Sequence, residues 1–288
     1  MAVNKPWRWI RLAGLLVCLL RPQAGWSEQA PGNELIDAVR DGSMARVEAL
    51  LANGADVNAR TPDGWTALML ACEAGRHDVV KLLLGKGADA NAAREDGGTA
   101  LASAAANGTM DVAKLLVAKG AQVNAKAKDG MTALMEACDK GNLGVAELLM
   151  DKGADVRAQD SRGWTALMYA TGAEDLNLVQ ALLAKGADVN ARRDDGGTAL
   201  MIAAGNGDLN IVGALAAKGA DVNAKTKDGR TALMDAASTG DAEAVRALLA
   251  MKADATAKDA QGKTALDLAA ANGYTDVSTL LAGAMQKR

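Results

Sequence analysis

Thr-Ala-Leu-Met-Leu-Ala at residues 66–71, followed by a glycine at position 75, is the stretch of sequence that decides the fold of this chain. A threonine in front of helix-forming residues is a typical N-cap, because its hydroxyl accepts a hydrogen bond from a free N–H group of the first turn. Glycine ends such a helix because it adopts the left-handed conformation at little steric cost. The stretch therefore predicts a short helix over residues 67–74.

The same triplet returns every 33 residues, with no insertion or deletion between copies. A second string, Gly-Ala-Asp-Val-Asn or a close variant, keeps the same period. Two motifs locked to one period indicate a repeat architecture. The triplet begins at Thr66, Thr99, Thr132, Thr165, Thr198, Thr231 and Thr264, and the second string begins at Gly54, Gly87, Gly120, Gly153, Gly186, Gly219 and Lys252.

A second helix is predicted in each unit, directly after the glycine that ends the first. In the unit of residues 66–98 its apolar stripe is Val79, Val80, Leu82 and Leu83, which has the spacing of one helix face. Neither helix is long enough to be stable alone, so the units must stack on one another. We therefore predict an all-α solenoid. The predicted N-caps of the second helices are Thr109, Asn142, Asp175, Asp208 and Asp241.

The Thr-Ala-Leu-Met-Leu-Ala of residues 66–71, the glycine after it and the closing Gly-Ala-Asp-Val-Asn-Ala resemble the ankyrin repeat, and the resemblance covers Asn33 to about Ala282. The resemblance implies about eight stacked 33-residue repeats, each a helix-turn-helix with a β-hairpin finger, which bind proteins through the fingers and inner helices. The family's Thr-Pro-Leu-His motif is altered, since alanine replaces proline in all seven units. Its histidine position holds Met69, Met135, Met168, Met201 and Met234, together with Ala102 and Asp267.

The first 27 residues have the pattern of a secretory signal peptide. Lys5, Arg8 and Arg11 precede a short apolar run at residues 12–20, and a small-x-small site follows at residues 25–27. The run is shorter than the roughly 20 residues of a membrane span, although an uncleaved anchor is the alternative. Cleavage after residue 27 would leave 28 basic against 35 acidic residues, a net charge of -7. We expect the periplasm as the destination and the extracellular medium as second choice.

The resulting domain organisation is a series of units that share one period. We assign residues 1–27 to the signal peptide, 28–32 to a short linker, 33–65 to an N-terminal capping repeat, 66–263 to six repeats and 264–288 to a C-terminal capping repeat.

Composition excludes several classes of function. The net charge of -3 lacks the basic excess of nucleic-acid-binding proteins. The chain has one histidine, His77, and neither zinc-ligand spacing nor a nucleophile or phosphate-binding motif. The five methionines of the altered motif lie about 10 Å apart from repeat to repeat, too far to share a copper(I) ion, so they are predicted to pack in the core. We predict no enzyme activity, no metal and no cofactor.

The two cysteines outside the signal peptide, Cys72 and Cys138, occupy the same position two repeats apart. Helix spacings of about 10 Å place them near 20 Å from each other, far beyond the reach of a disulfide. We predict that both are small core side chains.

An aspartate precedes the turn glycine in five units, and two interpretations of this row stay open. Asp-Gly is ordinary turn chemistry, and an acidic row also attracts a partner with a basic surface. At about 10 Å in water, neighbouring charges repel by only about 0.4 kcal/mol. The row consists of Asp63, Asp96, Asp129, Asp195 and Asp228.

The residue after the turn glycine is a position at which the family often varies with its partner, and here it includes Trp65 and Trp164. Because exposed tryptophan is enriched among binding hot spots, we predict that both contact a partner. The alternative is that each indole packs against the next finger. The unit of Trp164 departs most from the repeat, so the main contact is placed there. The predicted partner-binding residues are Trp65, Trp164, Tyr169, Arg162 and Met131, together with Arg230 and the five aspartates.

A period of 99 residues lies over the period of 33: Trp65 returns as Trp164, and Arg-Glu-Asp-Gly-Gly at residues 94–98 returns as Arg-Asp-Asp-Gly-Gly at residues 193–197. The copy is either a neutral duplication or a pair of related epitopes about 30 Å apart.

We expect a monomeric, exported protein that binds another protein, with no nucleic-acid partner and no membrane contact beyond the export signal. Two alternatives are an inhibitor or immunity protein of an exported toxin or hydrolase, and an accessory factor for an exported redox enzyme.

Overall fold

The computed structural model describes residues 33–286. The proposed signal peptide, the linker of residues 28–32 and the last two residues lie outside this range. The described residues form two compact units, which we call the N-terminal unit (residues 33–161) and the C-terminal unit (residues 162–286).

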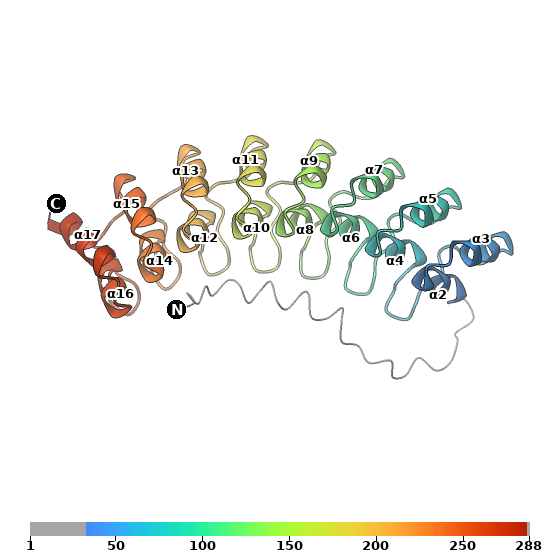
Figure 1. Cartoon of the computed structure of the whole chain (residues 1–288), viewed down its shortest axis with the longest axis horizontal. Helices are drawn as coiled ribbons and strands as arrows, with labels where there is room; N and C mark the ends of the chain where they lie inside the picture. The colour runs from blue at the N-terminus through green and yellow to red at the C-terminus, as the bar shows by residue number, and fades with distance from the viewer. Residues whose placement is uncertain (1–32, 287–288) are drawn as a thin grey trace. The chain divides into compact units, whose positions relative to one another are not determined.

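The N-terminal unit consists of four pairs of antiparallel helices (Figure 1). Within this unit, the first helices of the pairs contact one another in sequence order, from α2 to α8, and the second helices α5, α7 and α9 do the same. The pairs are α2 (Glu34–Asp41) with α3 (Met44–Ala52), α4 (Ala67–Glu73) with α5 (His77–Gly85), α6 (Ala100–Ala106) with α7 (Met110–Ala118), and α8 (Ala133–Asp139) with α9 (Leu143–Asp151).

The C-terminal unit repeats this arrangement with four further pairs (Figure 1). Its first helices also pack in sequence order, from α10 to α16. The pairs are α10 (Ala166–Gly172) with α11 (Leu176–Ala184), α12 (Ala199–Asn206) with α13 (Leu209–Ala217), α14 (Ala232–Thr239) with α15 (Ala242–Ala250), and α16 (Ala265–Ala271) with α17 (Thr275–Gln286). The prediction of an all-α solenoid built from helix pairs is confirmed.

The N-caps of the helices show where local sequence is decisive. All seven threonines of the Thr-Ala-Leu triplet cap a first helix; the Thr66 hydroxyl, for example, accepts from the Met69 N–H at 3.3 Å. Among the predicted second-helix caps, Asp175, Asp208 and Asp241 accept the expected backbone hydrogen bond.

Thr109 and Asn142 also occupy the predicted N-cap positions, of α7 and α9, but neither side chain accepts a hydrogen bond from its own helix. Thr109 instead directs its hydroxyl to the Ala104 carbonyl at 3.3 Å. The Asn142 amide donates to Ala105 O and Ala106 O of the preceding repeat, at 2.8 and 2.9 Å. Both side chains bind carbonyls in or near the preceding helix ends rather than their own N–H groups.

The core is built mainly from alanine, leucine, valine, isoleucine and methionine side chains, and the chain contains no phenylalanine. All five methionines of the altered motif are buried, which confirms that they pack in the core. Cys72 and Cys138 are also buried and are not joined in a disulfide, as predicted. Burial raises the pKa of the Cys72 thiol to about 12, so this thiol stays protonated and unreactive at neutral pH.

Each finger is a tight loop rather than a long β-hairpin. In the loop before α8, Ala127 N donates to Met131 O and Gly130 N donates to Ala127 O, both at 2.9 Å. Only isolated antiparallel bridges, such as Lys126 with Thr132, mark its base in the N-terminal unit. The chain is too short between the turn and the helix to add a paired strand.

Backbone hydrogen bonds join each finger to the next within a unit. Lys128 N donates to Asp96 O at 2.8 Å, and the equivalent bond in the C-terminal unit runs from Lys227 N to Asp195 O at 2.8 Å. This approach explains the turn glycine: a Cβ on Gly97 would lie 2.8 Å from Ala127 Cα. The fingers of each unit therefore form a hydrogen-bonded series.

The asparagine of Gly-Ala-Asp-Val-Asn also joins neighbouring repeats. Asn91 donates to Gly120 O at 2.9 Å and accepts from Gln122 N at 2.7 Å. The same pair of bonds forms at Asn58, Asn124, Asn190 and Asn223. This double contact gives a physical reason for the second motif.

Among the described helices, none combines the length and the apolar character that a bilayer span requires.

Candidate functional site

The acidic row lies on exposed fingertips, and most of its carboxylates take part in the turns. Asp96 Oδ1 accepts from Gly98 N at 2.9 Å, Asp129 Oδ1 accepts from Met131 N at 3.1 Å, and Asp195 Oδ1 accepts from Gly197 N at 2.8 Å. Asp63 Oδ1 accepts from the Thr61 hydroxyl at 2.6 Å. Asp228 is exposed and uses its backbone carbonyl to bind the next finger. This geometry supports the turn interpretation; attraction of a basic partner stays a prediction.

Trp65 is half-buried and covered by an arginine of the next finger. The Arg94 guanidinium carbon lies 4.4 Å from the centre of the indole, within the range of a cation–π interaction. Asp96 holds the guanidinium with two hydrogen bonds, of 3.0 and 2.7 Å. A Cβ on Gly98 would lie 2.4 Å from Arg94 Nη2, so glycine makes room for the arginine. Of the two interpretations of Trp65, the structure shows the one in which it packs against the next finger.

Trp164 has the same environment in the C-terminal unit, with additional contacts. Arg193 lies 4.9 Å from the centre of the indole and is held by Asp195, at 3.1 and 2.7 Å. The Tyr169 ring lies 5.2 Å from the Trp164 ring, and Arg162 donates to the Tyr169 hydroxyl at 2.8 Å. Three predicted site residues, Arg162, Trp164 and Tyr169, are thus brought together. The Tyr169 side chain is largely buried, with 8% exposed, so little of it is open to a partner.

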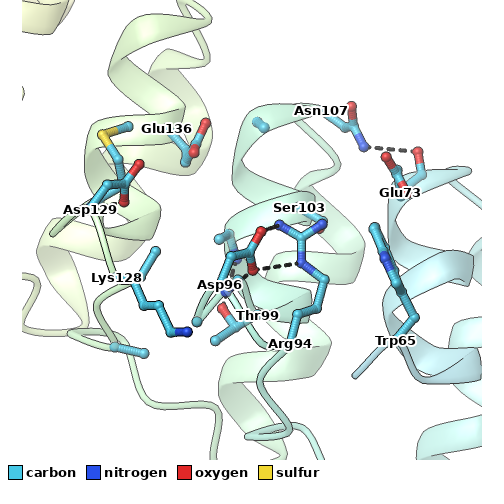
Figure 2. Close-up of a pocket in the computed structure, with 17 residues that line it drawn as sticks. Trp65, Glu73, Arg94, Asp96, Thr99, Ser103, Asn107, Lys128, Asp129 and Glu136 are labelled. Carbon is cyan, nitrogen blue, oxygen red and sulfur yellow. Dashed lines mark hydrogen bonds and ion pairs between the residues drawn. The ribbon is translucent and has the colours of Figure 1, made fainter. Parts of the chain in front are cut away.

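A groove of about 380 Å³ opens beside Trp65, entirely within the N-terminal unit (Figure 2). Trp65 and Arg94 form one side of the groove, and Asp129 and Glu136 lie on the other. Met131, another predicted site residue, also lines it. The small side chains of α6 that line the groove are Ala102, Ser103 and Ala106.

The groove exists because α6 lacks the large side chain that its neighbours carry. Ala102 occupies the position of the buried methionines Met69 and Met135, and Gly98 occupies the finger position of Trp65. Two successive small residues therefore leave space between larger side chains on the neighbouring repeats.

The groove carries more negative than positive charge. Its lining includes the carboxylates of Glu73, Asp96, Asp129 and Glu136 and the cations of Arg94 and Lys128. Burial raises the pKa of Glu136, an effect that nearby Lys140 opposes. Lys140 itself forms an ion pair with Asp139 at 2.7 Å.

Arg230, the remaining predicted site residue, is occupied within its own chain. It donates to Asp235 Oδ1 from Nε at 3.0 Å and from Nη2 at 2.7 Å. Burial raises the pKa of Asp235, although the adjacent Arg230 lowers it.

Sequence reasoning missed Ala102, Arg94 and Glu136 as members of the site. The signal for Ala102 was present, because it interrupts the series of methionines at the motif's fourth position. The recurrence of Arg94 as Arg193, together with Trp65 as Trp164, was a signal for Arg94. Glu136 carries no such signal, since charged residues are frequent in every repeat.

No set of three or more His, Cys, Asp or Glu side chains in residues 33–286 is arranged to hold a metal ion.

A family model described as ankyrin repeats (3 copies) matches residues 35–127, 87–160, 119–193 and 200–287. A second, described as ankyrin repeats (many copies), matches residues 172–215. No curated protein matches the sequence significantly. Together with the stacked helix pairs, these matches show that the chain belongs to the ankyrin-repeat family.

Proposed function

We propose that this chain is an exported, monomeric binding protein of the periplasm that holds a partner protein on the face made by its fingers and first helices. The observation that carries the proposal is the groove beside Ala102, which is open, lined by the half-buried Trp65 and bordered by charged residues. Interfaces use this combination of an aromatic anchor and a polar rim.

The groove is a more direct candidate for the contact than the cluster around Trp164. In that cluster the indole, Tyr169 and Arg162 already contact one another, and Arg193 covers the indole. The groove beside Trp65 has room for an incoming side chain. We therefore place the first contact in the N-terminal unit and keep Trp164 as a second.

The binding test is co-purification from the exported fraction with the tagged full-length chain. Wild type should recover a partner in fixed stoichiometry, and Ala102→Met, which fills the groove, should recover at least tenfold less. Ala118→Met is the matched control, because it makes the same change at an exposed position on α7 of the same repeat. Equal recovery by Ala102→Met and wild type would rule out the groove as the contact.

The export part of the proposal is tested by cell fractionation and N-terminal sequencing. The pattern of residues 1–27 leads us to expect an exported chain that begins near residue 28. A chain that keeps residues 1–27 and stays in the cytosol would contradict it.

The role of the complex is a separate question with its own readout. An inhibitor or immunity protein would silence a co-expressed toxin or hydrolase at one-to-one stoichiometry. An accessory factor would instead leave an exported redox enzyme less active when the chain is deleted. The acidic surface after cleavage, with a net charge of -7, favours a basic partner in either case.

A further inference from the structure

The duplication of 99 residues places two versions of one local arrangement in the same chain. Met131, Glu136 and Asp139 in the N-terminal unit correspond to Arg230, Asp235 and Ser238 in the C-terminal unit. In both versions an acidic residue lies in the first helix, five positions after the finger residue. Only the C-terminal version supplies its own cation at the finger position.

The C-terminal version shows how this carboxylate receives a guanidinium. Arg230 reaches from its finger and donates to Asp235 Oδ1 through both Nε and Nη2. Its Nη2 also donates to the Ser238 hydroxyl at 3.2 Å. The arginine thus lies along the first helix, on the side from which a partner would approach.

The N-terminal version lacks the guanidinium but keeps the acid. Met131 cannot pair with Glu136, and Glu136 makes no hydrogen bond or ion pair through its side chain in the described part of the chain. Glu136 is nonetheless half-buried, and burial raises the pKa of its carboxyl group. Lys140 and Arg94 act on this carboxylate without forming an ion pair with it. A partly desolvated carboxylate that has no ion-pair partner gains more from a cation in direct contact than an exposed carboxylate does.

The N-terminal version also has space where the C-terminal version is filled. Ala102 and Ser103 of the groove correspond to Met201 and Ile202, which are only 5% and 3% exposed. Ligand pockets span about 300–1,000 Å³, so a groove of about 380 Å³ suits one or two side chains rather than a whole element. Its apolar lining of Trp65 and Met131 suits the aliphatic stem of a long side chain.

From this comparison we propose that the groove beside Ala102 receives an arginine side chain of the partner protein, whose guanidinium pairs with Glu136 as Arg230 pairs with Asp235. The inference rests on the proposed function, because it names the chemistry of the partner at that contact. Four carboxylates against two cations in the lining favour a cationic group, and Asp96 already holds one of those cations, Arg94.

The probe for this site is the pentapeptide acetyl-Gly-Gly-Arg-Gly-Gly-amide, compared with the same peptide carrying citrulline, which is uncharged but has nearly the same shape. Binding is followed with the full-length chain by the NMR shift of the Trp65 indole N–H, assigned by its loss in Trp65→Phe. We expect the arginine peptide to shift this resonance with a Kd at least tenfold lower than that of the citrulline peptide. Equal shifts by the two peptides would overturn the proposal.

Three variants locate the binding site. Glu136→Gln removes the proposed counter-charge and Ala102→Met fills the space, and each should raise the Kd of the arginine peptide at least tenfold. Met131→Arg copies the finger residue of the C-terminal version, so its own guanidinium should occupy Glu136 and block the peptide to the same extent. Asp111→Asn, an exposed acid on α7, is the control and should leave the Kd unchanged.

Thermal unfolding separates a lost site from a lost fold. Met131→Arg should unfold at or above the temperature of wild type, because it adds an ion pair. Unfolding would therefore not explain a loss of peptide binding in this variant. If Met131→Arg or Glu136→Gln binds the arginine peptide as tightly as wild type does, the inference is wrong.

The inference and the proposed function can fail independently. If the partner is recovered equally by wild type and Glu136→Gln but lost in Ala102→Met, the groove binds a partner without the arginine contact. If the arginine peptide binds as expected but no exported partner is recovered, the contact stands and the proposed function fails.

Discussion

Trp65 in the N-terminal unit and Trp164 in the C-terminal unit occupy equivalent positions 99 residues apart, and an arginine of the next finger covers each indole. The first helices beside them differ. Ala102 and Ser103 leave a groove next to Trp65, whereas their counterparts Met201 and Ile202 are buried. The contact between a tryptophan and an arginine of the next finger is present in both copies, whereas the side chains of the first helix beside it differ. The two copies are therefore not identical as binding surfaces.

The largest effect is expected where the filled C-terminal version is opened. Met201→Ala removes a buried side chain, so the free energy of unfolding should fall by about 2–4 kcal/mol. The reciprocal Ala102→Met places the same side chain in existing space and should change stability by less than about 1 kcal/mol. Urea unfolding of both variants measures the two effects. Equal losses would show that the two positions are packed alike.

Truncation of the two tryptophans should have unequal costs. Trp164 contacts Arg193, Arg162 and Tyr169, whereas Trp65 is covered by Arg94. Trp164→Ala should therefore lower the free energy of unfolding by about 2–3 kcal/mol, and Trp65→Ala by about 1 kcal/mol. Thermal unfolding followed by circular dichroism ranks the pair. Equal losses would mean that the shared cation–π contact dominates, and the reverse order would contradict a stabilising role of the additional ring contact.

Replacement of Arg230 by methionine removes the internal cation and should reproduce the arrangement found at Met131. Arg230→Met leaves the half-buried carboxylate of Asp235 without its guanidinium, so stability at pH 7 should fall by about 1–2 kcal/mol, discounted for the partial exposure of the pair. The pKa of Asp235, already raised by burial, should rise further because Arg230 lowers it in the wild type.

The pH dependence of this loss has a definite sign. A carboxyl with a raised native pKa binds its proton more tightly in the folded state, so its contribution to stability is largest below the unfolded pKa, about 3.9, and falls as pH rises through the native pKa. The deficit of Arg230→Met should thus be small near pH 3 and complete at pH 7. Arg230→Met combined with Asp235→Asn should remove this dependence, and its persistence would assign it to another group.

The smallest expected effect concerns the glycine that closes each second helix. Lys252 adopts φ 66°, whereas its counterpart Gly153 adopts φ 85°. Left-handed backbone costs a lysine about 1–2 kcal/mol, part of which the greater freedom of an unfolded glycine offsets. Lys252→Gly should therefore gain about 0.5 kcal/mol, and Gly153→Lys should lose about 1 kcal/mol, in denaturant titrations. A loss in Lys252→Gly would show that the lysine side chain outweighs its strain.

The period, the order of the helices and most of the helix ends could be predicted from the amino-acid sequence. These features follow from short-range physics: Thr66 caps the helix that begins one residue later, and Gly207 and Gly240 end helices in the left-handed conformation. Because the same local signals recur at a fixed distance, the helices of each repeat begin and end at equivalent positions. The burial of Cys72 and of the motif methionines follows from the same register.

The contacts and spaces between the repeats could not be predicted in this way, because they depend on three-dimensional packing. Thr109 and Asn142 occupy N-cap positions, yet their side chains donate to carbonyls at the end of α6 and do not accept from their own helices. The contact of Arg94 with Trp65 joins residues 29 positions apart, and the space beside Ala102 depends on the side chains of three successive repeats. A local sequence pattern shows that such residues occupy equivalent positions in their repeats. It does not show whether their side chains contact one another or leave a groove, because that depends on the volumes of all the side chains around the space.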